Sequence, residues 1–233
     1  MIAGRERTGS IMRRFAWILV CVALALLQGC DPTGRLGMRE PEPPKPRATP
    51  SPPPPSPEKI AEAFTVLNAA LKAANERIIK ERGSRTVTAP HATAFEALTA
   101  GLTRLGMIVE IRDPDAGLLA VAAPAPKPLD AAEWDTTQRS DRPLMASIIC
   151  PILGEFCRTI TFEPEDFVIV INSTVRALEG GRSEVSLTAR MREIRPRPGV
   201  PRREYPPPTG VQMALDKIWA EFDRALAERQ SRR

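Results

Sequence analysis

Residues 166–194, DFVIVINSTVRALEGGRSEVSLTARMREI, alternate apolar and polar side chains on both sides of the sequence Glu179-Gly180-Gly181. Two glycines between alternating segments indicate a tight turn, so this stretch predicts a β-hairpin. A period of two places one face of each strand in the core and the other in water, which is typical of an antiparallel sheet. The inward positions are Phe167, Ile169, Ile171, Val175, Val185, Leu187, Ala189 and Met191.

The segments around this hairpin supply further strands and helices. Residues 84–89, 107–112 and 118–122 are predicted strands, and residues 92–105 and 211–229 carry apolar side chains at helical spacing. We therefore expect residues 84–230 to form an α+β domain. Its antiparallel sheet has about four or five strands, with helices packed on one face. The order of the strands stays open at this point.

Residues 58–83 precede this domain and predict an amphipathic helix. The apolar stripe has spacings of four and three residues and consists of Ile60, Phe64, Leu67, Leu71, Ala74 and Ile78. Three uses of the stripe are open: packing on its own domain, which is the commonest, self-association as a short coiled coil, and docking of a partner.

Residues 30–57 form a proline-rich linker. Eleven of the 26 residues from Pro32 to Pro57 are proline, which removes backbone donors and excludes a helix or a central strand. An extended polyproline conformation would reach roughly 80 Å. A plain disordered spacer, a stiff tether and a docking site for a proline-binding module are the alternatives.

Residues 123–165 are expected to be a long connection that is inserted in the domain and contains Cys150 and Cys157. Six intervening residues are too many for a zinc knuckle, no histidine lies nearby, and redox catalysis would favour C-x-x-C. We predict a structural disulfide between these two cysteines. The apolar residues around them would cap the core or form an exposed contact patch.

The N-terminus predicts a secretory signal. Arg13 and Arg14 precede the uncharged stretch FAWILVCVALALLQGC at residues 15–30. A membrane-spanning helix is the alternative, but the apolar run of about 13 residues is short of the roughly 20 that span a bilayer. Met12 opens a compact signal by itself, and we expect it to be the initiator.

The end of this stretch resembles the lipobox of bacterial lipoproteins, with Leu27, Gly29 and Cys30 at matching positions. The resemblance implies that signal peptidase II cleaves before Cys30, so that residues 1–29 are the signal peptide and Cys30 carries the lipid. The mature chain would then be tethered to a membrane and face the periplasm of a Gram-negative-type cell envelope. Asp31 resembles the signal for retention in the inner membrane, which favours that membrane slightly over the outer one.

A second resemblance covers residues 94–121, AFEALTAGLTRLGMIVEIRDPDAGLLAV. The order of helix, Leu-Gly, strand, turn and strand is similar to that in the lipoprotein of the outer-membrane β-barrel assembly machinery that has helix-grip-like domains. It implies a helix-grip-like fold and carries almost no implication for a shared partner.

Charge gives little reason to expect a nucleic-acid partner. The chain has a formal net charge of +5, of which the signal segment contributes +3, so the mature chain carries about +2. The notable cluster is Arg190, Arg192, Arg195, Arg197, Arg202 and Arg203. It is either a solvated face or a contact for anionic lipid headgroups or an acidic partner.

The sequence offers no catalytic motif. The only histidine is His91, which follows Pro90 where a helix is expected to start, and there is no G-x-S-x-G, H-E-x-x-H or phosphate-binding glycine loop. We expect no enzyme activity, cofactor or metal. The leading hypothesis is a structural, assembly or protein-interaction role with other envelope proteins or peptidoglycan; the oligomeric state is open. The runner-up is a small-ligand or lipid carrier with a pocket lined by Phe95, Ile169 and Trp219, and a peptidoglycan-active enzyme comes last.

Overall fold

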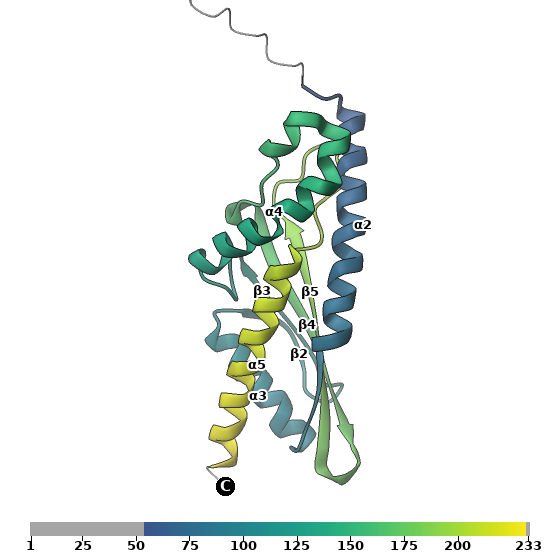
Figure 1. Cartoon of the computed structure of the whole chain (residues 1–233). Coiled ribbons are helices and arrows are strands. Elements are labelled where there is room, and N and C mark those ends of the chain that lie inside the picture. Colours follow the sequence, from purple (N-terminus) through teal and green to yellow (C-terminus); the bar gives the residue numbers. More distant parts are fainter. Residues whose placement is uncertain (1–53, 232–233) are drawn as a thin grey trace, which may run out of the picture. The chain divides into compact units, whose positions relative to one another are not determined.

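The computed structural model describes residues 54–231, and a five-stranded antiparallel sheet organises them (Figure 1). The strands run in the order β1-β5-β4-β3-β2. Their bounds are Ser84–Val87 (β1), Ile108–Asp113 (β2), Leu118–Pro124 (β3), Phe167–Leu178 (β4) and Arg182–Glu193 (β5). The helices are α2 (Pro57–Arg82), α3 (His91–Arg104), α4 (Ala131–Leu153) and α5 (Pro208–Gln230), with short 3₁₀ turns η1 (Gly154–Thr159), η2 (Pro164–Asp166) and η3 (Glu179–Gly181).

The predicted α+β class with an antiparallel sheet is therefore confirmed. The helices lie on one side of the sheet, as Figure 1 shows, and leave the other side uncovered. The predicted signal peptide and nearly all of the predicted proline-rich linker fall outside residues 54–231, where nothing in the structure bears on them.

The β4–β5 hairpin is the longest pairing in the sheet. Its ladder runs from Phe167 opposite Glu193 to Leu178 opposite Arg182 without a break in register. Gly180 and Gly181 turn the chain with φ angles of 74° and 70°, values that side chains with a Cβ rarely adopt. Every predicted inward position of the hairpin is buried, as the period of two requires.

The core lies between the inner face of the sheet and helices α3 and α5. Trp219 and Phe222 of α5 are buried there with Phe95 of α3. A Cβ on Gly101 of α3 would lie 3.0 Å from the backbone nitrogen of Phe222, so the absence of a side chain lets the two helices approach closely. This close contact between α3 and α5 completes the core beneath the C-terminal helix.

Helix α4 occupies much of residues 123–165, where the sequence predicts a long connection inserted in the domain. The helix begins with a capping box, in which the Asp130 carboxylate accepts from the backbone of Glu133 and the Glu133 carboxylate accepts from the backbone of Asp130. Pro143 and Pro151 lie inside the helix, although a proline in a helix interior usually kinks or breaks the helix. The buried face outweighs their cost and comprises Trp134, Thr137, Asp141, Met145, Ile149 and Leu153.

The stripe on α2 packs against α4 and α5 of the same domain, with Phe64, Leu67 and Leu71 buried and its other members half-buried. The helix also holds residues 202–206, which run alongside it after β5 (Figure 1). The Asn68 amide donates to the carbonyl of Arg202 at 2.6 Å and accepts from the backbone of Glu204 at 3.3 Å. Asn75, which is buried, donates to the carbonyl of Pro206 at 3.0 Å. Packing within the domain is therefore the use that the structure shows for this helix.

The N-terminus of α5 is capped by a side chain from another helix. Asp141 of α4 accepts from the backbone N–H of Thr209 at 2.8 Å and from its hydroxyl at 2.6 Å. Burial raises the pKa of Asp141 above its ordinary value, while the two hydrogen bonds from Thr209 act in the opposite direction. The cap fixes where α5 starts relative to α4.

We expect Asp141→Ala to lower the free energy of unfolding by about 1 kcal/mol, the usual loss for a cap. Because the pKa of Asp141 is higher in the folded state than in the unfolded state, ionisation of this carboxyl opposes folding. The stability that the protonated carboxyl contributes is lost as pH rises through the folded-state pKa. Asp141→Asn should therefore gain stability relative to the wild type between acidic and neutral pH, as measured by urea denaturation across that range. Asp135→Asn, an exposed change in the same helix, is the control. Parallel pH profiles for the wild type and Asp141→Asn would contradict this assignment.

Candidate interaction surface

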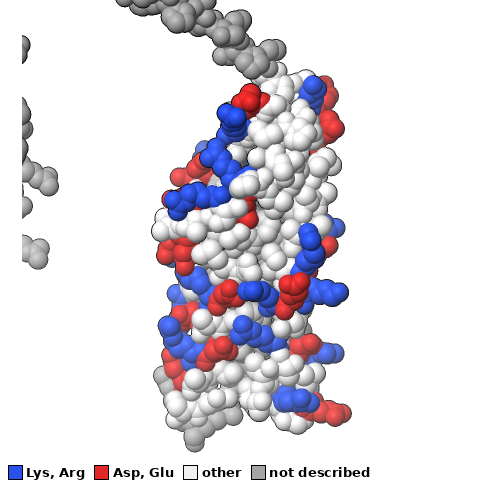
Figure 2. Space-filling model, viewed as in Figure 1, with Lys and Arg blue, Asp and Glu red and all other residues white. Residues whose placement is uncertain are grey.

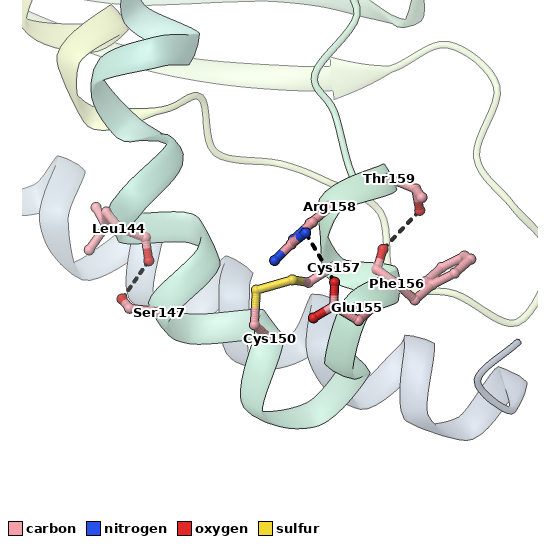
Figure 3. Close-up of a disulfide and its surroundings, with 8 residues drawn as sticks. All are labelled: Leu144, Ser147, Cys150, Glu155, Phe156, Cys157, Arg158 and Thr159. Atoms are coloured by element: carbon pink, nitrogen blue, oxygen red, sulfur yellow. Dashed lines mark hydrogen bonds and ion pairs between the residues drawn. A yellow bond between two sulfur atoms is a disulfide. The ribbon is translucent and has the colours of Figure 1, made fainter. Parts of the chain in front are cut away.

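The predicted disulfide joins Cys150 in the last turn of α4 to Cys157 in η1, with 5.0 Å between the Cα atoms (Figure 3). Cys157 is buried and Cys150 is half-buried. The surrounding apolar residues cap the core instead of forming a free patch, because Ile149 and Leu153 are buried and Phe156 packs against the core. The bridge therefore pins η1 onto the end of α4.

Replacing both cysteines by serine should lower the free energy of unfolding by about 2.5 kcal/mol, the chain-entropy value for so short a loop. Urea denaturation of the oxidised protein and the double variant measures the loss. Adding a reductant should bring the wild type to the variant and leave the variant unchanged. Equal stability of the two oxidised proteins would show that the bridge does not hold this end of the domain.

Arg203 is not on the surface, which corrects its place in the predicted anionic contact. Its side chain is 9% exposed and that of Glu193 is 6% exposed. The guanidinium donates to the Glu193 carboxylate at 2.6 and 3.2 Å, and to the carbonyl of Thr161 at 2.7 Å. It also lies 4.4 Å from the ring centroid of Phe167. These contacts satisfy a buried charge, so Arg203 is structural.

Arg203→Met should lower the free energy of unfolding by about 3–5 kcal/mol, because it leaves the Glu193 carboxylate buried and uncompensated. The neighbouring Arg202→Met, at an exposed position, should change stability by less than about 0.5 kcal/mol. Combining Arg203→Met with Glu193→Leu should recover most of the loss, because the unpaired charge is then gone. Similar denaturation curves for the Arg202 and Arg203 variants would contradict the buried pair.

The other five predicted arginines are exposed. Arg190 stacks over Tyr205, with its guanidinium carbon 4.3 Å from the ring centroid. Arg192 lies 3.7 Å from the Glu110 carboxylate, and both side chains remain about half exposed. Arg195, Arg197 and Arg202 lie in the segment that follows β5. Within residues 190–204 the only exposed carboxylate is that of Glu204, because the Arg203–Glu193 pair is buried. The segment thus carries excess positive charge.

The uncovered face of the sheet carries apolar side chains beside two of these arginines. The pairing places Ile108, Ala122, Val170 and Arg190 in one row across β2, β3, β4 and β5. The next row contains Ile111, Ala120, Asn172 and Thr188. We call these two rows, with Leu118, Val168 and Arg192 on the same face, the open-face strip.

The helix side of the molecule has a different charge pattern. In Figure 2, Lys and Arg atoms lie next to Asp and Glu atoms across the lower half of this side. The structure contains ion pairs between helices, Arg82–Asp216, Arg104–Glu228 and Lys217–Glu133, and one between β1 and α5, Arg85–Asp223. Charge on the helix side is therefore largely compensated within the domain.

A groove of about 440 Å³ lies between α3 and α5 on that side. Its floor contains Ala92, Ala100 and Ala225, and its rim contains the Arg104–Glu228 pair. Glu96 and Arg229 form a second pair in the lining, so the charged side chains there are two of each sign.

The residues considered for other functions are packed in the domain. His91 is the first residue of α3, and its Nε2 lies 3.1 Å from the carbonyl oxygen of Val175. This contact holds β4 against the helix. Phe95, Ile169 and Trp219, which would line a ligand pocket, are buried in the core. Among residues 54–231 no group of three or more His, Cys, Asp or Glu side chains could hold a metal ion. Over the same residues no helix has the length and apolar character to cross a membrane.

No protein family, curated protein or solved structure matches this chain. The candidate surface therefore rests on the geometry alone. The sequence predicts the arginines of this surface but not its aliphatic half, because the strand pattern of residues 107–112 does not show whether a helix covers either face.

Proposed function

We propose that the mature protein is a lipid-anchored lipoprotein of a Gram-negative-type cell envelope, with a non-enzymatic structural, assembly or protein-interaction role. The observation that carries the proposal is the lipobox-like Leu27-Gln28-Gly29-Cys30 at the end of an apolar run preceded by Arg13 and Arg14. Cys30 is the proposed lipid-bearing residue, and the domain faces the periplasm.

The disulfide supports the proposed compartment. Disulfides form and persist in oxidising compartments such as the periplasm and are rare in the cytosol. The Cys150–Cys157 pair is at bonding distance and half to fully buried. A secreted and oxidised domain is what a lipoprotein signal would deliver.

The surface chemistry supports a binding role over catalysis or carriage. A contact surface is supported by the open-face strip and the arginine-rich segment, which combine aliphatic, arginine and tyrosine side chains. A carrier role gains no support, because the side chains of Phe95, Ile169 and Trp219 fill the core that would have to hold a ligand. Asp31 supports the inner membrane slightly over the outer one as the site of the anchor.

The test of this proposal is the chemistry at Cys30. Mass spectrometry of the protein purified from membranes should find an N-terminal Cys30 carrying acyl chains, with residues 1–29 removed. Cys30→Ser should abolish acylation and leave the uncleaved chain with its signal attached. Cys21→Ser, a change inside the signal, is the matched control and should leave acylation intact. An unmodified Cys30 in the membrane fraction would refute the proposal.

The partner is found by crosslinking in intact cells followed by purification under denaturing conditions. Proteins captured with the wild type and lost with Cys30→Ser define contacts that depend on the anchor. Capture of the same set by both forms would mean that the anchor does not place the domain beside its partner.

A further inference from the structure

The open-face strip includes the two most exposed large aliphatic side chains of residues 54–231, Ile108 and Ile111, together with the exposed Leu118. Ile108 is 65% exposed, Ile111 58% and Leu118 45%. All three belong to the β2–β3 hairpin, and all six residues of β2 are exposed. The helix layer does not extend over this edge of the sheet, so water meets both faces of β2. Apolar side chains grouped at one exposed place mark a contact site more often than scattered ones do.

Positive charge lies on the same face of the sheet, on β5, with β4 and β3 between it and β2. Arg190 occupies the same row of the sheet as Ile108. Arg192 lies opposite Val168 on the same face and is partly compensated by the Glu110 carboxylate at 3.7 Å, with both side chains about half exposed. Among residues 54–231 the partner of Arg190 is the Tyr205 ring, and a cation–π contact leaves the N–H donors of the guanidinium available for anionic oxygens. The excess charge of residues 190–204 extends the basic area beyond the sheet. An occupant of this surface must offer both apolar and anionic groups.

A second copy of the chain fits this surface poorly. Face-to-face packing would bring two positive areas into one interface, where like charges are costly. Pairing of two β2 edges meets a register irregularity between Val109 and Ile111 and the charged residues Glu110, Arg112 and Asp113. Such bulges and charges are the devices that prevent edge-to-edge pairing.

A bilayer containing anionic lipids fits both the aliphatic and the basic part of this surface. Aliphatic side chains enter the boundary between headgroups and acyl chains, while arginines pair with lipid phosphates at headgroup level. Each basic residue near an anionic membrane contributes about a five-fold gain in binding.

We propose that the uncovered face of the sheet docks on the anionic bilayer to which the protein is tethered, with Ile108 and Ile111 inserted and Arg190 and Arg192 on the phosphates. This proposal rests on the lipid anchor of the proposed function. It assigns the domain a preferred orientation, in which the helices α2, α4 and α5 face away from the membrane.

The test uses the purified lipidated protein in vesicles. With Cys30 acylated and the Cys150–Cys157 pair oxidised, Ile111→Cys introduces a single thiol for an environment-sensitive fluorophore. Vesicles contain phosphatidylcholine alone or with 30% phosphatidylglycerol, plus lipids with a quencher on the acyl chain. We expect a blue shift and at least two-fold stronger quenching in the anionic vesicles than in the neutral ones. The matched control is Val66→Cys on α2, which is 43% exposed away from the sheet and should show neither change.

Charge reversal provides the second arm. Arg190→Glu with Arg192→Glu should bring quenching at position 111 down to the neutral-vesicle value, and so should about 0.5 M salt, which shortens the screening length. Three results would overturn docking: equal quenching at positions 66 and 111, no quenching at 111 in anionic vesicles, or quenching that ignores the charge reversal. Flotation of every form with both vesicle types measures membrane attachment through the lipid anchor, independently of docking. A protein that floats without quenching therefore disproves docking alone, and one that fails to float disproves the anchor.

Discussion

The buried pair of Arg203 and Glu193 is the interaction on which the arrangement of this domain depends. Two ionised groups inside a protein are tolerated only when they bond one another and their remaining polar atoms find partners. Here the guanidinium also bonds the Thr161 carbonyl and lies over Phe167, so one side chain joins the end of β5, the start of β4 and the segment before η2. Because Arg203 belongs to the chain between β5 and α5, the pair also fixes where α5 can begin.

The two sides of the domain have different chemistry for the same topological reason. Helices cover one side of the sheet and pair their charges with one another, as in Arg104–Glu228 and Lys217–Glu133. The other side has no helix layer, so its aliphatic residues and the arginines of β5 remain available. A tethered protein meets its surroundings at high effective concentration. In the lipid-anchored form that we propose, a modest contact through the uncovered side would then suffice for docking.

The sequence predicts the sheet better than it predicts the site. Alternation identifies the β4–β5 hairpin because the period of two is unbroken over two twelve-residue strands. The sequence does not predict α4 as one helix, because Pro143 and Pro151 indicate a break that tertiary packing overrides. The Asp130/Glu133 capping box is the sequence signal for the start of this helix.

The buried arginine had a signal too. Glu193 continues the inward series of Leu187, Ala189 and Met191, and a carboxylate at an inward position needs a buried cation. What the sequence could not show is which arginine supplies it, since Arg202 and Arg203 are adjacent and only the path of the backbone separates them. The exposure of β2 was equally hidden, because alternation indicates which side chains share a face and not whether a helix covers it.

The hydrogen bonds between α2 and the chain after β5 have an evolutionary consequence. Asn68 and Asn75 bond main-chain atoms of Arg202, Glu204 and Pro206, and every residue type has a carbonyl. The exposed side chains of this segment, those of Arg202 and Glu204, can therefore be exchanged without releasing it from its place. Mutation could retune the electrostatics of the surface from one lineage to another while the architecture beneath stays constant.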